Sequence, residues 1–382
     1  MTAPYWIAPD QLFDGQRLRP AMVLCVEGGK ITALGHLANM PKPSKPRRLA
    51  GILTPGFVDL QVNGGGDALL NHNPTPQTMA IMANAHRRFG TVAIMPTVIT
   101  DAPDVLTRAV DAALAATGQA GIVGLHIEGP HISAKRRGTH AERHVRPLDD
   151  TTIRMVRTLR AAHIPVMITL APEAVQPGQI SALAATGAVI SIGHSDATAE
   201  ITRHALAEGA SCFTHLFNAM SPMLNRAAGV VGAAINSTAY AGIICDGIHV
   251  ADEMVGLAVR ARPLPDRMFL VSDAMPTVGG SDHFQLYGQT IRLCDGQLLN
   301  DEGSLAGAHV TMAQSLHRLI AIVGIPPETA LRMAVTVPAQ VIGRPDLAGL
   351  TGRDVGDLVL LGPDFSQAMS LPTALADYTA NA

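Results

Sequence analysis

Four side chains that could carry out metal or acid–base chemistry each stand at the end of a short apolar run. Glu128 closes the run within Gly121–Pro130, and His194, His215 and Asp273 close three later runs. Gly and Pro punctuate strand ends, so these side chains are predicted to lie where buried strands open into loops. A carboxylate and two imidazoles suit a divalent metal ion, and a second carboxylate beside them could exchange a proton with water. The pattern predicts a catalytic metal site.

Taken singly, each of these residues has an ordinary structural explanation. A Glu before Gly-Pro is most often a solvated turn residue, and a His in an apolar run is usually a hydrogen-bonded core residue. Their recurrence at four strand ends favours the metal site. Three protein ligands leave a position for water, whose pKa a metal ion lowers towards ~7. Asp273 would then act first as general base and later as acid.

The elements that must position these residues alternate in type from Ile52 onwards. Apolar runs that suit strands buried on both faces are followed by Ala- and Leu-rich helical stretches. Eight such units predict a TIM-type (β/α)8 barrel, whose functional side chains gather at the C-terminal ends of the strands. A doubly wound open sheet is the alternative. The expected strands are Gly56–Val62, Val92–Ile99, Gly121–Ile127, Val166–Leu170, Ala188–Gly193, Ala210–His215, Ala241–Cys245 and Met268–Ser272.

The two ends of the chain have a different character from its middle. Residues 1–53 read as short β elements, and strand character returns at Gly356–Leu361. Residues 1–53 and 344–382 are therefore expected to form one small, discontinuous β-sandwich domain, with residues 54–343 as the barrel. Within the barrel segment, the glycines and polar residues between Pro276 and Ala308 predict a long loop.

Composition excludes several classes of partner. The chain has 382 residues, of which 47% are hydrophobic and 15% charged, with a formal net charge of −3. Neither nucleic acid nor an anionic membrane surface is an expected partner. No apolar run approaches the ~20 residues of a membrane span, and the N-terminus lacks the layout of a signal peptide. The cysteines are scattered without a C-x-x-C pair, which favours free thiols in the cytoplasm.

Seven short motifs then occur in order along the chain, and together they resemble the N-acetylglucosamine-6-phosphate deacetylases of the amidohydrolase superfamily. The resemblance spans roughly residues 51 to 340 and is weaker in the small β domain. The motifs are Gly56-Phe57-Val58-Asp59-Leu60-Gln61-Val62-Asn63-Gly64, His126-Ile127-Glu128-Gly129-Pro130, Gly138-Thr139-His140, Gly193-His194-Ser195, Thr214-His215-Leu216-Phe217-Asn218-Ala219-Met220, Asp246-Gly247-Ile248-His249 and Val271-Ser272-Asp273-Ala274.

The resemblance implies hydrolysis of the acetamide of N-acetyl-D-glucosamine 6-phosphate to D-glucosamine 6-phosphate and acetate, in amino-sugar catabolism and cell-wall recycling. It makes Glu128, His194 and His215 the ligands of one divalent metal ion per subunit, Zn²⁺ first, with Fe²⁺, Mn²⁺ or Co²⁺ as alternatives. Asp273 becomes the acid/base, and His140 helps to polarise the acetamide carbonyl.

The same resemblance assigns residues to the substrate. Gln61 is expected near the metal ion or its water, and Asn218 and Ala219 would present a turn to the sugar phosphate. Arg226 and His249 would supply positive charge for the phosphate; the less favoured alternatives are an ordinary surface cation for Arg226 and a structural loop histidine for His249. In related enzymes one such cation comes from the neighbouring subunit, which implies a homodimer. The segment that would close over the substrate is Leu305-Ala306-Gly307.

Two departures from the resemblance matter. Many amidohydrolases carry His-x-His where this chain has Gln61-Val62-Asn63, and amides are poorer metal ligands, which puts a second metal ion in doubt. Arg226 is followed by Ala227, whereas relatives often have Glu-Pro after this Arg, so its role is less secure.

Three other functions remain open. The enzyme could be another mononuclear amidohydrolase, acting on N-acetylgalactosamine 6-phosphate or on a cyclic amide. It could also be a sugar-phosphate-binding protein without activity, although binding alone would need no general base such as Asp273. His126, two residues before Glu128, is expected to be a core histidine beneath the site.

Overall fold

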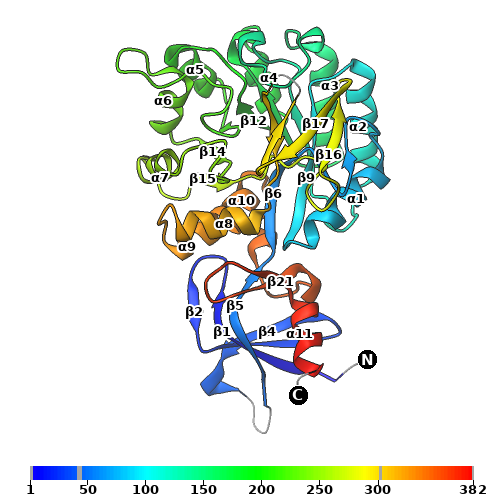
Figure 1. Ribbon diagram of the computed structural model, residues 1–382, viewed down its shortest axis with the longest axis vertical. Helices are drawn as coiled ribbons and strands as arrows, with labels where there is room; N and C mark the ends of the chain where they lie inside the picture. The colour runs from blue at the N-terminus through cyan, green and yellow to red at the C-terminus, as the bar shows by residue number, and fades with distance from the viewer. Residues whose placement is uncertain (1–2, 41–44, 301–302, 381–382) are drawn as a thin grey trace.

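A parallel eight-stranded barrel forms the larger part of the molecule (Figure 1). The computed structural model describes residues 3–40, 45–300 and 303–380. Neighbouring barrel strands follow one another in chain order without a reversal, which excludes a doubly wound sheet. A parallel bridge between Val62 and Ala274 joins the first strand to the segment after the last. The strands are β6 (Phe57–Val62), β9 (Thr91–Ile99), β10 (Leu125–Glu128), β11 (Val166–Leu170), β12 (Val189–Ile192), β13 (Cys212–Phe213), β14 (Tyr240–Ile243) and β15 (Met268–Leu270).

Helices surround this barrel. Helix α3 shows how the sequence specifies them: the Asp149 carboxylate caps its N-terminus by accepting the Thr152 N–H at 2.7 Å. Its buried residues Ile153, Val156 and Leu159 recur at helical spacing and form the apolar face. The helices are α1 (Pro76–Arg87), α2 (Pro103–Ala115), α3 (Asp150–Ala161), α4 (Gln179–Ala184), α5 (Ala199–Ala207), α6 (Gly229–Ile235), α7 (Asp252–Arg260), α8 (Met312–Ala321), α9 (Pro327–Leu331) and α10 (Val337–Val341), with a π-helical turn at Arg332–Thr336.

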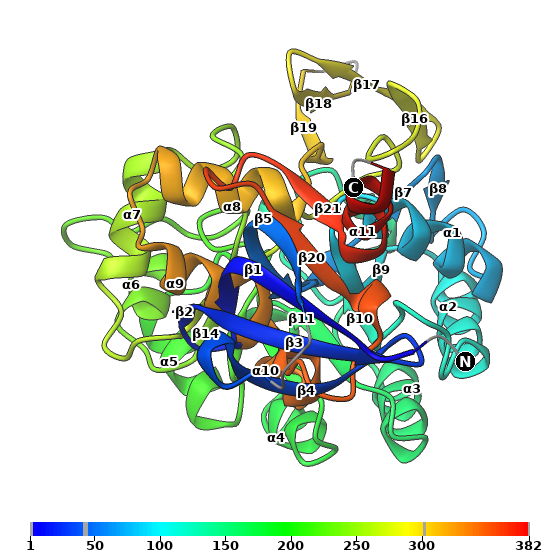
Figure 2. The ribbon, with the colours of Figure 1, turned by 90° about the horizontal axis from the view of Figure 1, so that it is seen from below.

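The two ends of the chain form one separate mixed sheet below the barrel in Figure 1. Helix α11 (Leu371–Ala380) packs on it, and Figure 2 shows the sheet from below. This sheet has its own apolar core, which includes Ile7, Leu24, Leu53 and Leu358. The predicted fold class is confirmed. The strands are β1 (Tyr5–Phe13), β2 (Leu18–Pro20), β3 (Met22–Glu27), β4 (Lys30–His36), β5 (Arg47–Pro55), β20 (Leu358–Leu361) and β21 (Ala368–Ser370).

The exact division of the chain into domains stays a proposal. We place the boundaries after residues 53 and 343. Strand β5 of the small sheet runs to Pro55, and the first barrel strand begins at Phe57, so a boundary a few residues later fits the strand ends equally well.

The prediction of a loop between Pro276 and Ala308 is wrong for most of that segment. An antiparallel sheet of four strands forms there, beside the barrel in Figure 2. Tyr287 and Gly288 both have positive φ and make a tight turn, and Phe284 and Leu286 alternate with exposed residues. The polar, solvent-facing positions of this small sheet resemble a loop in sequence. Its strands are β16 (His283–Leu286), β17 (Gln289–Cys294), β18 (Gln297–Leu299) and β19 (Leu305–Ala308); a further two-stranded sheet pairs β7 (Gly64–Gly65) with β8 (Ala68–Leu69).

None of the helices in residues 3–40, 45–300 and 303–380 has the length and apolar character needed to cross a membrane.

Candidate active site

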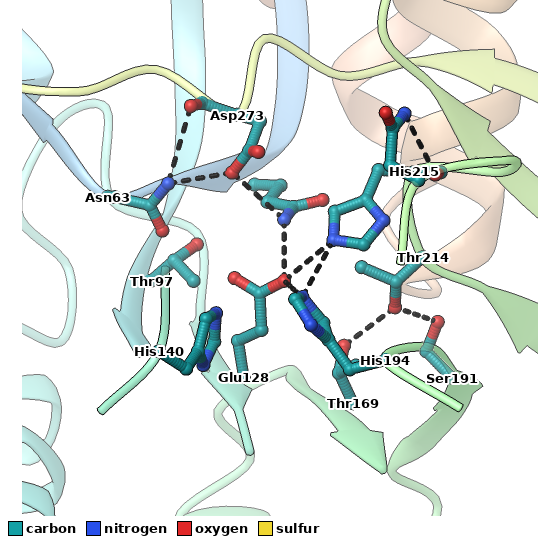
Figure 3. Close-up of polar contacts among 12 residues, drawn as sticks. Asn63, Thr97, Glu128, His140, Thr169, Ser191, His194, Thr214, His215 and Asp273 are labelled. Atoms are coloured by element: carbon teal, nitrogen blue, oxygen red, sulfur yellow. Dashed lines mark hydrogen bonds and ion pairs between the residues drawn. The ribbon is translucent and has the colours of Figure 1, made fainter. Parts of the chain in front are cut away.

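Glu128, His194 and His215 meet at the C-terminal end of the barrel, and all three are buried. The Glu128 Oε1 atom lies 3.2 Å from His194 Nε2 and 3.0 Å from His215 Nε2. The two Nε2 atoms are themselves 3.0 Å apart. Figure 3 shows the three side chains pointing toward one point from β10 and from the loops after β12 and β13.

The hydrogen bonds around these side chains fit a cation between them. His194 Nδ1 lies 2.8 Å from the Arg136 carbonyl, which can only accept, so Nδ1 carries the proton and Nε2 presents a lone pair. His215 Nδ1 is buried and has no hydrogen-bond partner among the described residues. When neither Nε2 atom carries a proton, two ring nitrogens 3.0 Å apart repel as lone pairs unless a cation lies between them. This donor set suits a transition-metal ion.

Asp273 lies beside this cluster, held by two amide side chains. Asn63 Nδ2 donates to Asp273 Oδ1 at 2.7 Å, and Gln61 Nε2 donates to the same oxygen at 3.0 Å. Gln61 Nε2 also donates to Glu128 Oε1 at 3.0 Å, so it bridges the two carboxylates. Both amides donate to Oδ1, and neither of them contacts Asp273 Oδ2.

The two carboxylates differ in proton affinity. Burial, together with the nearby negative charge of Glu128, raises the pKa of Asp273 to about 6. Burial alone would also raise the pKa of Glu128, but the adjacent imidazoles of His194 and His215 outweigh burial and hold it well below its usual range. Glu128 therefore stays ionised while Asp273 can exchange a proton near neutral pH.

Three of the candidate catalytic and metal-binding residues have left-handed backbone conformations, which residues other than Gly rarely adopt. The φ angles are 47° at His194, 28° at His215 and 51° at Asp273. Such conformations cost of order 1–3 kcal/mol each, and they concentrate at functional sites. They also end the strands early, which explains why β13 stops at Phe213, two residues before the end of the predicted strand.

The ring of His140 lies next to that of His194, with the two ring centroids 4.4 Å apart. Burial lowers the pKa of His140 to about 3, and the neighbouring His194 ring adds to this effect, so the His140 ring is neutral. His140 Nδ1 is 2.7 Å from the Thr100 hydroxyl oxygen. That hydroxyl is also 3.4 Å from the Glu128 carbonyl, a much weaker contact.

A cavity of about 170 Å³ opens in front of these residues. Of the residues predicted to bind substrate, Asn218, Ala219, His249, Leu305 and Gly307 line this cavity, as do His140 and the metal-site residues.

Three other predicted substrate residues lie elsewhere. Gln61 is buried between the two carboxylates, and Ala306 is buried without lining the cavity. Arg226 is exposed in the loop between β13 and α6 and does not line the cavity either.

His249 is oriented by its own loop. Asp246 Oδ2 accepts a hydrogen bond from His249 Nδ1 at 2.6 Å, and Asp246 Oδ1 accepts the backbone N–H groups of Ile248 and His249 at 2.9 Å each. With Nδ1 held in this way, the opposite ring nitrogen is free to face the cavity that His249 lines.

Sequence reasoning assigned no role to several residues that support the site. Asn63 was noted only as a poor metal ligand, yet it holds Asp273. Thr100 contacts His140, and Asp246 holds His249. The Asp-Gly-Ile-His motif could have signalled Asp246, because a carboxylate three residues before a His can reach its ring. Thr100 gives no such signal, because it lies 40 residues from His140 in the chain.

Comparison with known proteins gives consistent matches over most of the chain. The sequence model of the amidohydrolase family matches residues 52–378. An N-acetylgalactosamine-6-phosphate deacetylase from Shewanella sp. (strain ANA-3) is 42% identical over 324 residues, 83% of this chain and 81% of the relative. An N-acetylglucosamine-6-phosphate deacetylase from Haemophilus influenzae (strain ATCC 51907 / DSM 11121 / KW20 / Rd) is 32% identical over 324 residues, 82% of this chain and 83% of the relative.

Solved structures agree with these sequence matches. The crystal structure of N-acetylglucosamine-6-phosphate deacetylase from Pasteurella multocida has a TM-score of 0.88 and 32% identity, with 96% of this chain and 97% of that chain covered. A mutant of the N-acetyl-D-glucosamine-6-phosphate deacetylase from Mycobacterium smegmatis, in complex with N-acetyl-D-glucosamine-6-phosphate, has a TM-score of 0.86 and 29% identity. There, 97% of this chain and 98% of that chain are covered.

Proposed function

This chain belongs to the amidohydrolase family, and from that premise we propose that it hydrolyses the acetamide of an N-acetylated hexosamine 6-phosphate, releasing the amino-sugar phosphate and acetate. The observation that carries the proposal is the convergence of Glu128, His194 and His215 beside Asp273 in one cavity. The relatives named above act on such sugar phosphates. A cyclic amide would need no phosphate contacts, and a binding protein would need no proton-transfer group such as Asp273.

We propose that Oε1 of Glu128 and the Nε2 atoms of His194 and His215 hold one divalent ion per chain, with Zn²⁺ preferred over Fe²⁺, Mn²⁺ and Co²⁺. When bound, such an ion activates water and polarises a carbonyl oxygen. Gln61 and Asn63 occupy the positions where a second ion would need ligands, and both amides already donate to carboxylates. A single ion therefore fits this site.

In the proposed reaction Asp273 moves the proton. Its Oδ2 atom takes a proton from the attacking water, whose oxygen adds to the acetamide carbon. The same carboxyl then delivers that proton to the sugar nitrogen as the carbon–nitrogen bond breaks. Gln61 and Asn63 keep Oδ1 hydrogen-bonded throughout, so the two oxygens of Asp273 stay distinct.

His140 would stabilise the oxygen that gains negative charge. Its ring is neutral, so one nitrogen carries a proton. If the Thr100 hydroxyl donates to Nδ1 across the short 2.7 Å contact, the proton lies on Nε2. Nε2 can then donate a hydrogen bond to the carbonyl oxygen of the substrate. Leu305 and Gly307 line the same cavity and would cover the bound substrate.

We propose that His249, Asn218 and Ala219 bind the phosphate. All three line the cavity, and Asp246 orients His249. Arg226 is exposed outside the cavity of its own subunit, so we propose that it serves the site of a partner subunit in a homodimer. Mixing Arg226→Ala with Asp273→Asn subunits tests this: one of the mixed sites then has both residues, and activity should return. Two variants that stay inactive when mixed would contradict the shared site.

The sugar is the least constrained part of the proposal. N-acetyl-D-glucosamine 6-phosphate is the substrate predicted from the sequence motifs. The galacto epimer is a second candidate, because the relative that is 42% identical is an N-acetylgalactosamine-6-phosphate deacetylase. We further propose a cytoplasmic role in amino-sugar catabolism and cell-wall recycling; the four cysteines Cys25, Cys212, Cys245 and Cys294 are all free.

Acetate release from both epimers, each with and without the 6-phosphate, tests the proposed substrate class. Turnover that requires the phosphate is expected, and the ratio of the two kcat/KM values identifies the epimer. Equal rates without the phosphate would contradict the proposed phosphate-binding role of His249 and Arg226.

A further inference from the structure

A chain of hydrogen bonds runs through the barrel interior directly beneath the candidate metal ligands. Ser191 Oγ lies 2.6 Å from Thr214 Oγ1, which lies 2.6 Å from Thr169 Oγ1. Thr169 Oγ1 is in turn 2.7 Å from His126 Nε2. These four buried residues, called the hydroxyl–imidazole chain below, come from the adjacent strands β10, β11 and β12 and the residue after β13. Figure 3 shows the three hydroxyl groups of Ser191, Thr214 and Thr169 beside His194.

The direction of every hydrogen bond in this chain is fixed from one end. His126 Nδ1 lies 3.0 Å from the Leu60 carbonyl, which can only accept, so Nδ1 carries the proton. The fully buried ring is neutral, and Nε2 must therefore accept from Thr169. The Thr169 hydroxyl then accepts from Thr214, which accepts from Ser191. Ser191 thus donates to Thr214, Thr214 donates to Thr169, and Thr169 donates to His126.

The hydroxyl–imidazole chain connects the strands that carry the three ligands. His126 precedes Glu128 by two residues on β10, so both side chains are on the same side of that strand. Thr214 is the residue before His215, and Ser191 precedes His194 by three residues. A Cβ atom on Gly193 would lie 2.8 Å from Thr169 Cγ2 and 2.9 Å from Thr214 Cβ. The backbone beside His194 therefore rests directly on two members of the chain.

We propose that the hydroxyl–imidazole chain is a positioning device, which sets the spacing of Glu128, His194 and His215 and so tunes their affinity for a divalent ion. This inference rests on the proposed metal centre. A hydrogen-bond network with one allowed direction has one low-energy arrangement, so it fixes the strands against one another more narrowly than apolar packing does. Groups that orient ligands in this way typically change metal affinity 10–100-fold when they are removed.

The link at Thr169 is the most sensitive point of the chain. Thr169→Val keeps the shape of the side chain but leaves His126 Nε2 without a donor and Thr214 without an acceptor. Ser191→Ala removes only the first donor, and the Thr214 hydroxyl still donates to Thr169. The fixed direction therefore predicts a larger effect for Thr169→Val than for Ser191→Ala.

Thr91 provides a matched control. It is a buried barrel threonine on β9 whose Oγ1 has no hydrogen-bond partner among the described residues. Thr91→Val makes the same chemical change in the same barrel, outside the hydroxyl–imidazole chain. Thr169→Ser provides a rescue, because it restores the hydroxyl.

The experiment measures Co²⁺ and Zn²⁺ affinity of the metal-stripped proteins by competition with a chromophoric chelator, together with the visible spectrum of the Co²⁺ forms. We expect Thr169→Val to weaken binding by about 10–100-fold and to change the Co²⁺ spectrum. Thr169→Ser and Ser191→Ala should stay within a few-fold of the unsubstituted protein, and Thr91→Val should match it.

Equal affinities and spectra for Thr169→Val and Thr91→Val would overturn the inference, as would an effect of Ser191→Ala as large as that of Thr169→Val. If Thr169→Val does not fold, Thr214→Val and Ser191→Ala still test the order of effects, because Thr214→Val leaves Thr169 without its donor. Unchanged binding for Thr214→Val and a large loss for Ser191→Ala would overturn the inference. A failure of the unsubstituted protein to bind either ion would instead overturn the proposed metal centre, and this inference with it.

Discussion

At the scale of single residues, the site depends on the contrast between two buried carboxylates. Glu128 contacts two imidazoles and stays ionised, whereas burial raises the pKa of Asp273 to about 6. The general base must be ionised to take a proton from water, so activity needs a pH above that value. We expect kcat/KM to fall about tenfold per pH unit as the pH drops below about 6.

This fall of kcat/KM at low pH is the acid limb of the pH profile. The hydrogen bond from Asn63 provides a way to assign it to Asp273. The Asn63 contact stabilises the carboxylate and lowers its pKa, opposing the effect of burial. Asn63→Ala removes the donor, so the pKa of Asp273 should rise and the acid limb should move to higher pH. The measurement is a pH profile of kcat/KM for both proteins. A limb that stays in place, or moves to lower pH, would rule out Asp273 as the group responsible.

Thr100 tests the proposed role of His140. Thr100→Val keeps the side-chain shape but removes the hydroxyl that lies 2.7 Å from His140 Nδ1. Without that donor the ring proton can move to Nδ1, and Nε2 can no longer donate to the substrate. We expect kcat to fall about 10–100-fold with little change in KM, and Thr100→Ser to recover most of the loss. Normal kcat in Thr100→Val would show that this contact does not set the His140 tautomer.

At the scale of elements, the barrel strands were more predictable from the sequence than the segment between Pro276 and Ala308. Strands such as β11 (Val166–Leu170) are apolar on both faces, so their pattern is recognisable without any tertiary information. Strands β16 to β19 alternate exposed and buried residues over short lengths, and their glycines suggest a loop. Their hydrophobic partners, including Leu69, Ile99 and Met275, come from distant parts of the chain.

Gly307 on β19 tests how this small sheet supports Asp273. Its φ is 69°, and a Cβ atom there would lie 2.6 Å from Met275 Cγ and 3.2 Å from the Asp273 carbonyl oxygen. Gly307→Ala should destabilise the protein by about 1–3 kcal/mol and lower kcat/KM at least tenfold, because the added methyl group displaces the Asp273 segment. The measurements are urea unfolding and steady-state kinetics.

Gly288 is the matched control in the same sheet. Its φ is 86°, but a Cβ atom there would meet nothing within 4 Å. Gly288→Ala therefore has a similar backbone cost without the clash, and its kcat/KM should be normal. Equal losses of activity in the two variants would mean that backbone strain, and not the contact with Met275 and Asp273, causes the effect.

At the scale of the whole molecule, buried neutral histidines make stability depend on pH. Burial lowers the pKa of His86 to about 4, from 6.5 as its ordinary value. Between those values the unfolded chain binds a proton that the folded chain does not, so stability rises with pH there and is lost as the pH falls from 6.5 to 4. The 2.5-unit difference corresponds to about 3 kcal/mol.

Urea unfolding between pH 7 and pH 4 checks this contribution. His86→Gln keeps a donor for the Gly64 carbonyl, which lies 2.9 Å from His86 Nε2, and should lose less stability than the unsubstituted protein over this range. An unchanged pH dependence in His86→Gln would contradict the assignment.

The sequence separation between contacting residues also explains which parts of the site were predictable. Glu128, His194, His215 and Asp273 each follow an apolar strand, so barrel geometry alone places them together. Support from Asn63 and Thr100 depends on contacts that span from 40 to more than 200 residues of the chain. No local pattern marks such contacts, so they emerge only from the folded structure.

The most direct test of the account is a metal titration of the stripped protein, with acetate release from the two N-acetylhexosamine 6-phosphates as the measure. We predict no turnover without metal, a linear return of activity that ends at one equivalent of ion per chain, and no return in Asp273→Asn although that variant binds the same equivalent. Full activity in the stripped protein, or normal turnover by Asp273→Asn, would contradict a metal-dependent deacetylase with Asp273 as its acid/base.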